Sequence, residues 1–352
     1  MGGQNGRSGA AGNRRILIVK TSSIGDVVHA LPIASVIDRQ DPNVFVGWVV
    51  RKRCAELVRG NPHLDRVYVT PDRPTLADLL RLRGELRADS YDTALDPQGL
   101  FISGLITWMS GARRRVGLDL NREGNALFLT EPTVPARSNR DRHAIDILRG
   151  FLPKIGIDEH CEWPTLDYLA SGETLPSPVS QLDRKAGLIA LNVGASSAYK
   201  QWPVDRWSSL ARMLIDAGYT PIVIGGPGDV DAAAAVCGAA GTGENILDLA
   251  GRTTLRGLAH VLAHCDLLVS ADTGPLHLAV AVGTATIALF GSTNPVRTGP
   301  YGSRNRVISK ELSCSPCFRA PTCAGRVDCM RAISAGEVAS AVTRLVKEFA
   351  QC

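Results

Sequence analysis

Short apolar runs alternate with longer amphipathic stretches along most of the chain. Buried strands of a parallel sheet read as continuous apolar runs, and the helices between them cover both faces of the sheet. The alternation therefore predicts an α/β protein with doubly wound sheets. In the first half it predicts strands over residues 15–20, 44–50, 66–69 and 93–96, separated by helices over 27–39, 76–86 and 100–110.

The same alternation starts again in the second half. It predicts strands over 188–193, 221–225, 266–270 and 285–290, with helices over 204–217, 231–240, 255–264 and 275–282. An amphipathic helix over 334–349 closes the chain. Ser334 is its expected N-cap, and Glu337 stands at the capping-box position three residues later.

The alternation is interrupted once, between residues 161 and 185, where Pro164, Pro176 and Pro178 occur. Prolines and serines in such a stretch are typical of a linker between domains. We therefore expect a flexible Gly-rich tail, an N-terminal domain, a linker and a C-terminal domain over residues 1–13, 14–165, 166–186 and 187–352. The tail lacks the apolar core of a signal peptide.

Composition narrows the class of protein. The chain has 352 residues, 45% hydrophobic and 21% charged, which is ordinary for a globular protein with two cores. No apolar run reaches the roughly 18 residues that span a bilayer, since the longest, 276–290, is broken by His277, Gly283 and Thr284. Nine cysteines without an export signal indicate free thiols in the cytoplasm.

The distribution of charged residues suggests what kind of partner the protein binds. The formal net charge is only +5, yet basic residues cluster over 51–53, 113–115 and 137–142, all in the first half. Each cluster by itself fits a solvated surface. Together they suggest an anionic partner, either nucleic acid or a phosphorylated or acidic surface.

The turn after the first predicted strand is the first candidate site, because ligands of open α/β sheets bind beyond the carboxyl ends of strands. Residues 20–26, KTSSIGD, offer hydroxyls and a glycine at a helix start, where backbone N–H groups attract anions. The turn matches neither GxGxxG nor GxxxxGK[ST], so Rossmann dinucleotide binding and P-loop chemistry lose support. Asp26 is either a helix-dipole acid or a functional carboxylate.

A second candidate turn, residues 270–277, also joins a strand to a helix. Asp272 or Thr273 suits the N-cap, Gly274 lets a phosphate approach the backbone, and Pro275 suits a first helical position. His277 lies one turn inside an otherwise apolar helix, on the side of the loop. It is either a satisfied core histidine or part of a ligand site.

Two further loops of the second half carry polar side chains after strands. Residues 193–203 hold Ser196 and Ser197, which offer hydroxyl donors, and Lys200, a flexible cation suited to a diphosphate. Residues 225–229 end in Asp229, which is placed to hold a ribose hydroxyl. Residues 229–231 also form a DxD, a pattern that holds a metal in some sugar transferases but fits many helix starts.

Taken together, these segments resemble glycosyltransferase family 9, and within it the lipopolysaccharide heptosyltransferases, those of type I above all. The resemblance spans roughly residues 15–350. It rests on four blocks in the same order and with the same separations: residues 18–32, residues 200–203 with Trp207, residues 272–274 with His277, and residues 290–293.

The resemblance implies a GT-B fold, with two Rossmann-like domains facing across a cleft and ADP-heptose bound to the second. It makes Asp26 the general base. The implied donor-binding residues are Ser196, Ser197, Lys200, Asp229, Asp272, Thr273, Gly274 and His277. The sequence departs from the family at two points: Ser196 and Ser197 replace paired threonines, and Asp229 replaces a longer glutamate.

The basic clusters then acquire a specific partner, an anionic Kdo-lipid A acceptor at the cytoplasmic face of the inner membrane. The candidate acceptor-binding residues are Ser22, Ser23, Arg51, Arg113 and Arg142. Nucleic acid becomes the weaker partner, because few aromatic residues are interleaved with the basic ones. The resemblance therefore predicts a cytoplasmic protein peripheral to the inner membrane.

Four cysteines, Cys314, Cys317, Cys323 and Cys329, fall in the segment 314–329 as C-x₂-C-x₅-C-x₅-C. Four thiolates suit a structural zinc or iron site, although the second pair lacks zinc-ribbon spacing. Many members of the family have a similar stretch, and some that modify proteins hold iron there. The alternative is a turn-rich loop with reduced thiols.

The activity implied is an inverting, metal-independent transfer of heptose from ADP-L-glycero-D-manno-heptose to a lipopolysaccharide inner-core acceptor, with no cofactor required. Two alternatives remain at this point. One is a family 9 transferase with a protein acceptor, such as an autotransporter, or another glycan acceptor. The other is a non-catalytic nucleotide-sugar-binding protein.

Overall fold

The structure is a computed structural model that describes residues 14–120, 122–137, 141–171, 175, 177–182, 187–241, 245–317 and 323–350. The chain divides into two compact units, Met1–Tyr168 and Leu169–Cys352. This division falls within the stretch 166–186 that the prolines marked as a linker. The tail expected over residues 1–13 lies outside the described residues, as does part of that linker.

Unit 1 is built on a five-stranded parallel sheet with the order β3-β2-β1-β4-β5. The strands are β1 (Arg15–Val19), β2 (Phe45–Arg51), β3 (Arg66–Thr70), β4 (Thr93–Asp96) and β5 (Arg114–Gly117). The central strand β1 is apolar and buried after its first residue. The sheet therefore has the buried centre that the apolar runs predicted.

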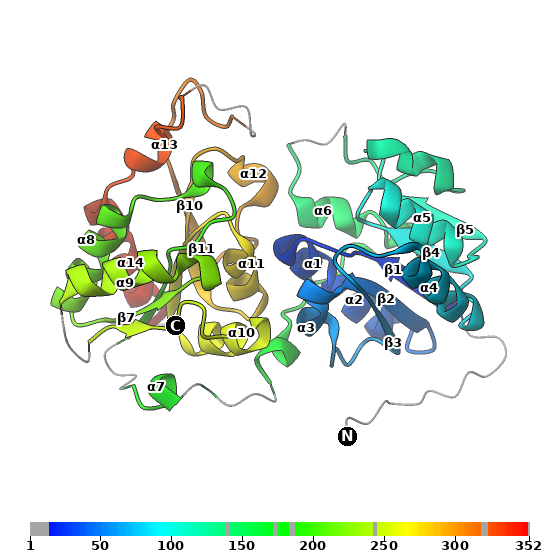
Figure 1. Cartoon of the computed structure of the whole chain (residues 1–352), viewed down its shortest axis with the longest axis horizontal. Helices are drawn as coiled ribbons and strands as arrows, with labels where there is room; N and C mark the ends of the chain where they lie inside the picture. The colour runs from blue at the N-terminus through cyan, green and yellow to red at the C-terminus, as the bar shows by residue number, and fades with distance from the viewer. Residues whose placement is uncertain are drawn as a thin grey trace. The chain divides into compact units, whose positions relative to one another are not determined.

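Helices cover both faces of this sheet. They are α1 (Ile24–Ala30), α2 (Pro32–Gln40), α3 (Ala55–Val58), α4 (Leu76–Ala88), α5 (Phe101–Met109) and α6 (Ala144–Arg149), with 3₁₀ turns η1 (Lys52–Cys54), η2 (Arg122–Phe128) and η3 (Pro153–Ile155), while η4 (Asp167–Ala170) contains the point where the two units divide. Helices α4 and α5 lie side by side (Figure 1). They bury Leu82, Leu86 and Ile106 against Leu17 and Val19 of β1.

Unit 2 is built on a six-stranded parallel sheet with the order β11-β10-β9-β6-β7-β8. The strands are β6 (Leu188–Asn192), β7 (Thr220–Ile224), β8 (Leu247–Asp248), β9 (Leu267–Ala271), β10 (Ala285–Phe290) and β11 (Asn305–Ser309). Both units thus have the doubly wound α/β architecture expected from the sequence.

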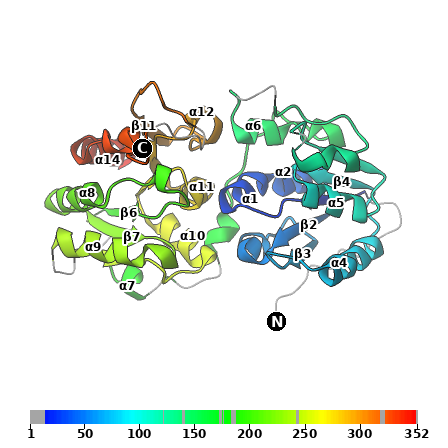
Figure 2. The ribbon, with the colours of Figure 1, turned by 45° about the horizontal axis from the view of Figure 1, so that its top comes forward.

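The helices of unit 2 are α7 (Ser177–Ser180), α8 (Val204–Asp216), α9 (Val230–Ala240), α10 (Leu255–His264), α11 (Gly274–Ala281), α12 (Pro295–Thr298), α13 (Asp328–Arg331) and α14 (Ala335–Ala350), with η6 (Ala198–Lys200) and η7 (Pro227–Asp229). The backbone N–H of Glu337 donates to the Ser334 hydroxyl at 3.2 Å, which confirms Ser334 as the cap of α14. Figure 2 shows α14 alongside α8.

Two buried tryptophans anchor the loop that precedes α8. Trp202 and Trp207 are each 1% exposed, and their rings meet edge to face with centroids 4.8 Å apart. The Trp202 indole N–H also donates to the carbonyl of Ile333 at 3.1 Å. This anchoring fixes the end of the loop that carries Lys200.

Two expectations about the elements were wrong. The helix expected over 27–39 is instead α1 and α2, which meet at Leu31, because Pro32 has no N–H to continue the hydrogen-bond ladder. Strands β5, β8 and β11 were not expected at all. They are edge strands with polar or half-buried residues, so they lack the apolar run that marks a central strand.

Among the described residues, no helix combines the length and the apolar character that a membrane crossing requires.

Candidate active site

Unit 1 has a topological switch point between β1 and β4, because the chain runs from β1 towards β2 but reaches β4 from β3 on the other side. Ligands of open α/β sheets bind beyond the carboxyl ends of strands at such points. Lys20 follows β1 there and is 6% exposed. Its ammonium donates to the carbonyl of Pro97, just after β4, at 3.1 Å.

Gln98 fastens the two turns of this switch point together. Its side-chain carbonyl accepts hydrogen bonds from the backbone N–H groups of Thr21 and Ser22, each at 3.2 Å. The carboxylate of Asp96, which is fully buried, accepts from the N–H groups of Gln98 and Gly99 at 3.1 and 3.0 Å. Burial raises the pKa of Asp96, against the effect of these hydrogen bonds. The turn leading to Asp26 therefore has a fixed backbone.

Asp26 lies at the first turn of α1 and is exposed to solvent. Its carboxylate accepts from the Ser23 hydroxyl at 2.7 Å and from the Ser23 N–H at 3.1 Å. Desolvation opposes its ionisation, but Lys20, the bonds from Ser23 and nearby His29 outweigh this and lower the pKa of Asp26 to about 2. The carboxylate is thus ionised at neutral pH, accessible and held in one orientation.

The structure brings only some of the expected basic residues near Asp26. Arg51 ends β2, and its backbone N–H donates to the carbonyl of Thr21 at 3.1 Å. Arg142 precedes α6, which packs against α1. Arg113 directly precedes the amino end of β5, so it lies at the edge of the parallel sheet opposite to Asp26.

Unit 2 has its own switch point, between β6 and β9. Asn192 ends β6 and is 2% exposed. Its amide donates to the hydroxyls of Ser270 and Thr273, both at 2.9 Å, and to the carbonyl of Gly194 at 3.2 Å. Asn192 therefore fixes the start of two loops, those after β6 and β9.

Lys200, Asp272 and His277 meet at this switch point. The Lys200 ammonium donates to the carboxylate and the carbonyl of Asp272 at 2.8 and 2.9 Å, and His277 Nε2 lies 3.4 Å from the other carboxylate oxygen. Desolvation opposes ionisation of Asp272, but His277 and Lys200 hold its pKa well below the usual range. The Thr298 hydroxyl adds a longer bond at 3.4 Å.

The start of α11 is not capped by a side chain. Thr273 occupies the N-cap, but its hydroxyl is engaged by Asn192 and forms no cap hydrogen bond. The carboxylate of Asp272 is engaged by Lys200 and His277 instead. The helix start beside the Lys200 ammonium can therefore accept an anion.

Comparison with known proteins agrees with this geometry. The profile of glycosyltransferase family 9 (heptosyltransferase) matches residues 79–327. Lipopolysaccharide heptosyltransferase 1 of Pseudomonas aeruginosa is 30% identical over 316 residues, which cover 87% of this chain and 86% of that protein. The chain belongs to glycosyltransferase family 9.

Solved structures of the family show the same fold. The E. coli heptosyltransferase WaaC with ADP superposes with a TM-score of 0.75 at 25% identity, covering 94% of this chain and 99% of that one. The same E. coli enzyme with ADP-2-deoxy-2-fluoro heptose gives a TM-score of 0.73 at 23% identity, again over 94% and 99%. With the two parallel sheets, this confirms the GT-B fold expected from the sequence.

The other residues that the sequence analysis expected to bind the donor lie on the carboxyl edge of the same sheet. The Ser197 hydroxyl accepts from the Tyr199 N–H at 3.4 Å and so caps η6, while Ser196 is exposed. The Asp229 carboxylate accepts from the Gly226 N–H at 2.8 Å. It lies directly over Gly194, where a Cβ would come within 2.1 Å of it, so the loops after β6 and β7 touch.

The described part of the cysteine segment shows no group of residues that could hold a metal ion. All four thiols are free. Residues 318–322 lie outside the described residues, and in the rest no three His, Cys, Asp or Glu residues gather closely enough to hold a metal ion. Cys329 is part of the core, packed against Gly291, and burial raises the pKa of its thiol. The DxD at 229–231 likewise belongs to no such group.

Sequence reasoning missed the residues that hold the site in place, namely Lys20, Asp96, Gln98, Asn192 and Thr298. Asn192 carried a weak signal, since it is a polar residue that ends an apolar run in LIALN. Asp96 and Gln98 similarly follow the apolar run of β4 in ALDPQG. In both turns, the sequence signal for these supporting residues was a polar residue at the carboxyl end of a buried strand.

Proposed function

We propose that the protein transfers heptose from ADP-L-glycero-D-manno-heptose to a Kdo-lipid A or lipopolysaccharide inner-core acceptor. The proposal is supported by membership of family 9 and by relatives that are lipopolysaccharide heptosyltransferases. The observation that carries it is the group of Lys200, Asp272 and His277 beside the uncapped start of α11. Such a group suits the diphosphate of a nucleotide-activated sugar.

On the donor side, Lys200 and the first N–H groups of α11 take up the charge that develops on the departing ADP. Asp272 holds the Lys200 ammonium at the helix start through one carboxylate oxygen, and His277 contacts the other oxygen of the same carboxylate. Asp229, on the neighbouring loop, holds a ribose hydroxyl, while Ser196 and Ser197 offer donors to the phosphates. A solved E. coli relative that contains ADP supports the nucleotide.

On the acceptor side, Asp26 is the general base. The acceptor oxygen attacks the anomeric carbon from the face opposite the diphosphate, its proton passes to Asp26, and the bond to ADP breaks. This chemistry inverts the anomeric configuration. The low pKa of Asp26 keeps it ionised, and its exposure leaves it open to the acceptor hydroxyl.

Arg51, Arg142, Ser22 and Ser23 lie near Asp26 in unit 1, where they suit the phosphates and carboxylates of the acceptor. Arg113 lies at the opposite edge of the sheet and is not included in this acceptor site. An acceptor of this kind is carried by lipid, so we place the protein in the cytoplasm, peripheral to the inner membrane.

The two alternatives receive no comparable support. Two relatives that match more than 80% of this chain are named for lipopolysaccharide rather than for a protein acceptor. A non-catalytic binding protein has no need of an ionised, accessible carboxylate at the position of Asp26. A structural metal at the four cysteines stays a prediction, and elemental analysis for zinc and iron tests it directly.

The decisive experiment is a transfer assay with ADP-heptose, run with and without Kdo-lipid A. We expect one heptose to be added to the acceptor, one ADP to be released for each transfer, and little ADP without acceptor. ADP-glucose serves as the control donor. Transfer to a protein but not to Kdo-lipid A, or ADP-heptose binding without any transfer, would contradict the proposal.

A further inference from the structure

The exposed large apolar side chains of unit 1 are confined to one layer. Among the residues that the structure describes, they lie on α4, α5 and η2 alone: Leu76 (73% exposed), Leu80 (55%), Phe101 (44%), Trp108 (47%) and Leu127 (84%). Scattered exposed apolar residues are normal in a folded protein, but a group of large ones on one surface indicates a partner.

These side chains can form one surface. Leu76 and Leu80 are one turn apart on α4, and Phe101 and Trp108 are two turns apart on α5, so each pair lies along one side of its helix. Helices α4 and α5 lie side by side in both views of the ribbon (Figures 1 and 2). Helix α5 also packs against η2, where the rings of Phe101 and Phe128 are 5.2 Å apart.

Unit 2 has no equivalent surface in its described part. Its exposed large apolar residues are smaller, four valines and one methionine, and they are spread over α8, α9, α12 and β11. The concentration in unit 1 is therefore a property of the α4–α5–η2 surface and not of the chain as a whole.

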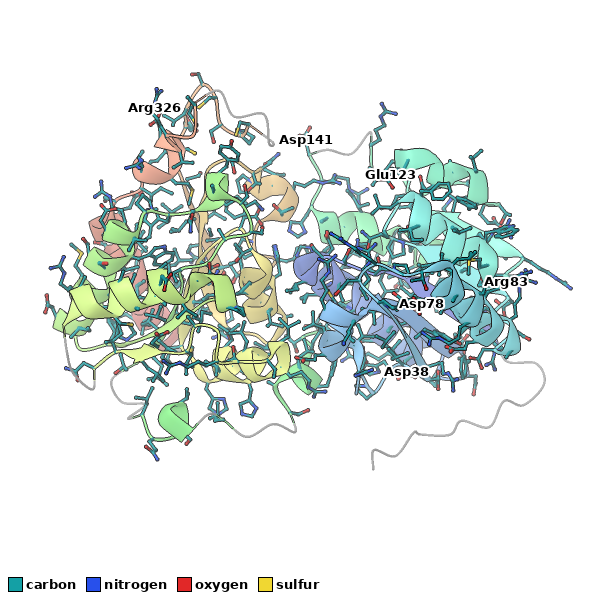
Figure 3. All side chains as sticks on the ribbon, viewed as in Figure 1. Asp38, Asp78, Arg83, Glu123, Asp141 and Arg326 are labelled. Carbon is teal, nitrogen blue, oxygen red and sulfur yellow. The ribbon has the colours of Figure 1, made fainter. Side chains whose placement is uncertain are left out.

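The charges around this surface are mainly positive. Arg73, Arg83 and Arg113 are exposed, and none forms an ion pair with a described carboxylate, whereas Arg87 donates to the carbonyl of Met109 at 3.0 Å. Arg81 is neutralised by the two acids of α4, Asp78 and Glu85. Figure 3 labels Arg83 and Asp78 on α4, together with Glu123, the acid of η2. An apolar surface with unpaired arginines is complementary to anionic headgroups above acyl chains.

We propose that the α4–α5–η2 surface docks the protein onto an anionic phospholipid bilayer. Leucine and aromatic side chains enter the boundary between headgroups and acyl chains, and the arginines reach the lipid phosphates. Leu76 and Phe101 begin helices that follow the carboxyl ends of β3 and β4. They therefore lie towards the sheet edge that carries Asp26, where docking brings a lipid-linked acceptor near. This last step rests on the proposed function, whereas the docking itself does not.

The test is co-sedimentation of the full chain with vesicles of phosphatidylethanolamine and phosphatidylglycerol, with phosphatidylcholine vesicles as the neutral comparison. We expect binding to the anionic vesicles that weakens as salt is raised. The double variant Leu80→Gln/Leu127→Gln should lower the partition coefficient about tenfold, since two apolar side chains lose their place in the interface. The matched control Met213→Gln/Val307→Gln, on unit 2, should stay within about twofold.

A second pair of variants tests the charges. Arg83→Gln should weaken binding to anionic vesicles several-fold and leave binding to neutral ones unchanged, whereas Arg212→Gln, an exposed arginine of α8, should change neither. Equal vesicle binding by Leu80→Gln/Leu127→Gln and its control overturns the docking surface. So does light scattering that shows a wild-type dimer and a monomeric variant, because the surface would then bind a second copy of the chain.

Transfer to a deacylated, water-soluble acceptor separates this proposal from the proposed function. Wild-type protein that transfers heptose to the soluble acceptor but does not bind vesicles overturns the docking surface and leaves the function standing. Vesicle binding that is lost in Leu80→Gln/Leu127→Gln supports the docking surface even if no heptose is transferred. With both proposals correct, that variant keeps its rate on the soluble acceptor and loses rate only on acceptor embedded in vesicles.

Discussion

Unit 1 contains two helix starts with nearly the same local structure and different surroundings. At α1 the carboxylate of Asp26 accepts from the hydroxyl and N–H of Ser23 at 2.7 and 3.1 Å. At α4 the carboxylate of Asp78 accepts from the hydroxyl and N–H of Thr75 at 2.7 and 3.0 Å. At both helix starts a hydroxyl residue is followed three positions later by an aspartate, as in a capping box.

The surroundings distinguish the two. Asp26 follows the central strand at the switch point and has Lys20 and His29 near it, on a backbone that Gln98 fixes. Asp78 follows the edge strand β3, and the charged group that acts on it is Arg81, itself largely exposed. A capping aspartate thus becomes a candidate base through its place in the sheet and the charges beside it, and not through the local motif.

Unit 2 repeats the comparison with two lysine–carboxylate pairs. Lys200 lies 2.8 Å from Asp272, and Lys310 lies 2.7 Å from Glu337. The carboxylate side chain is 7% exposed in the first pair and 39% in the second. A surface pair contributes little to stability, whereas a desolvated pair fixes a charge in place. Both lysines follow strands, but only the first pair lies beside an uncapped helix start, since Ser334 caps α14.

The largest effect should come from replacing each of the two aspartates by asparagine. Asp26→Asn keeps the shape and removes the base, so kcat should fall by about a thousandfold, within the usual range for general bases, while ADP affinity changes little. Asp78→Asn is the matched control and should leave kcat unchanged. Steady-state transfer rates and ADP titration measure both. A tenth of the wild-type rate in Asp26→Asn would show that Asp26 is not the base.

An intermediate effect should come from the lysines. Lys200→Met removes the cation from the diphosphate, so kcat/KM for ADP-heptose should fall about a hundredfold, as for other preorganised charges that stabilise a leaving group. Lys310→Met breaks the exposed pair and should cost less than about 1 kcal/mol of stability, with no loss of activity. Equal kinetic losses in the two variants would mean that Lys200 acts only through the fold.

The fold could be predicted from the sequence where strands are buried. Central strands such as β4 and β10 were expected with the bounds that the structure shows, because apolar runs mark them. Three of the four edge strands, β5, β8 and β11, were missed because their residues are polar or half-buried, whereas the edge strand β3 was expected. Two arginines of the basic cluster over 113–115 lie in β5, where Arg115 donates to the carbonyls of Ala112 and Phe128.

Of the candidate site, only the loops that carry its side chains could be predicted. Asp26, Lys200, Asp272 and His277 stand in segments whose order in the chain resembles a known family. The contacts that hold them do not follow from local pattern, because they join residues far apart in the chain. Gln98 and Thr21 are 77 positions apart, and Asn192 and Ser270 are 78.

The smallest expected effect concerns the pH dependence of activity, and it is tested at the starts of α1 and α4. Asp26 accepts a proton only when ionised, so activity falls as the pH drops through its pKa, which is lowered from 3.8 to about 2. Ser23→Ala removes one of the hydrogen bonds that lower it, so the pKa should rise towards 3.8 and the acid limb of kcat/KM should move up by less than that difference. At neutral pH the carboxylate stays ionised in both forms, so any change of rate there reports the loss of the Ser23 hydroxyl from the acceptor site and not a change in protonation. The share of stability that comes from ionised Asp26 is present above 3.8 and lost as the pH falls through about 2, and in Ser23→Ala this loss begins at higher pH. NMR of the Asp26 carboxyl carbon follows the titration directly.

Thr75→Ala, the same change in the other capping box, should weaken the start of α4 without moving the acid limb. Equal shifts in both variants would mean that the helix start alone sets the behaviour of its aspartate, and the surroundings of Asp26 would then not explain its reactivity.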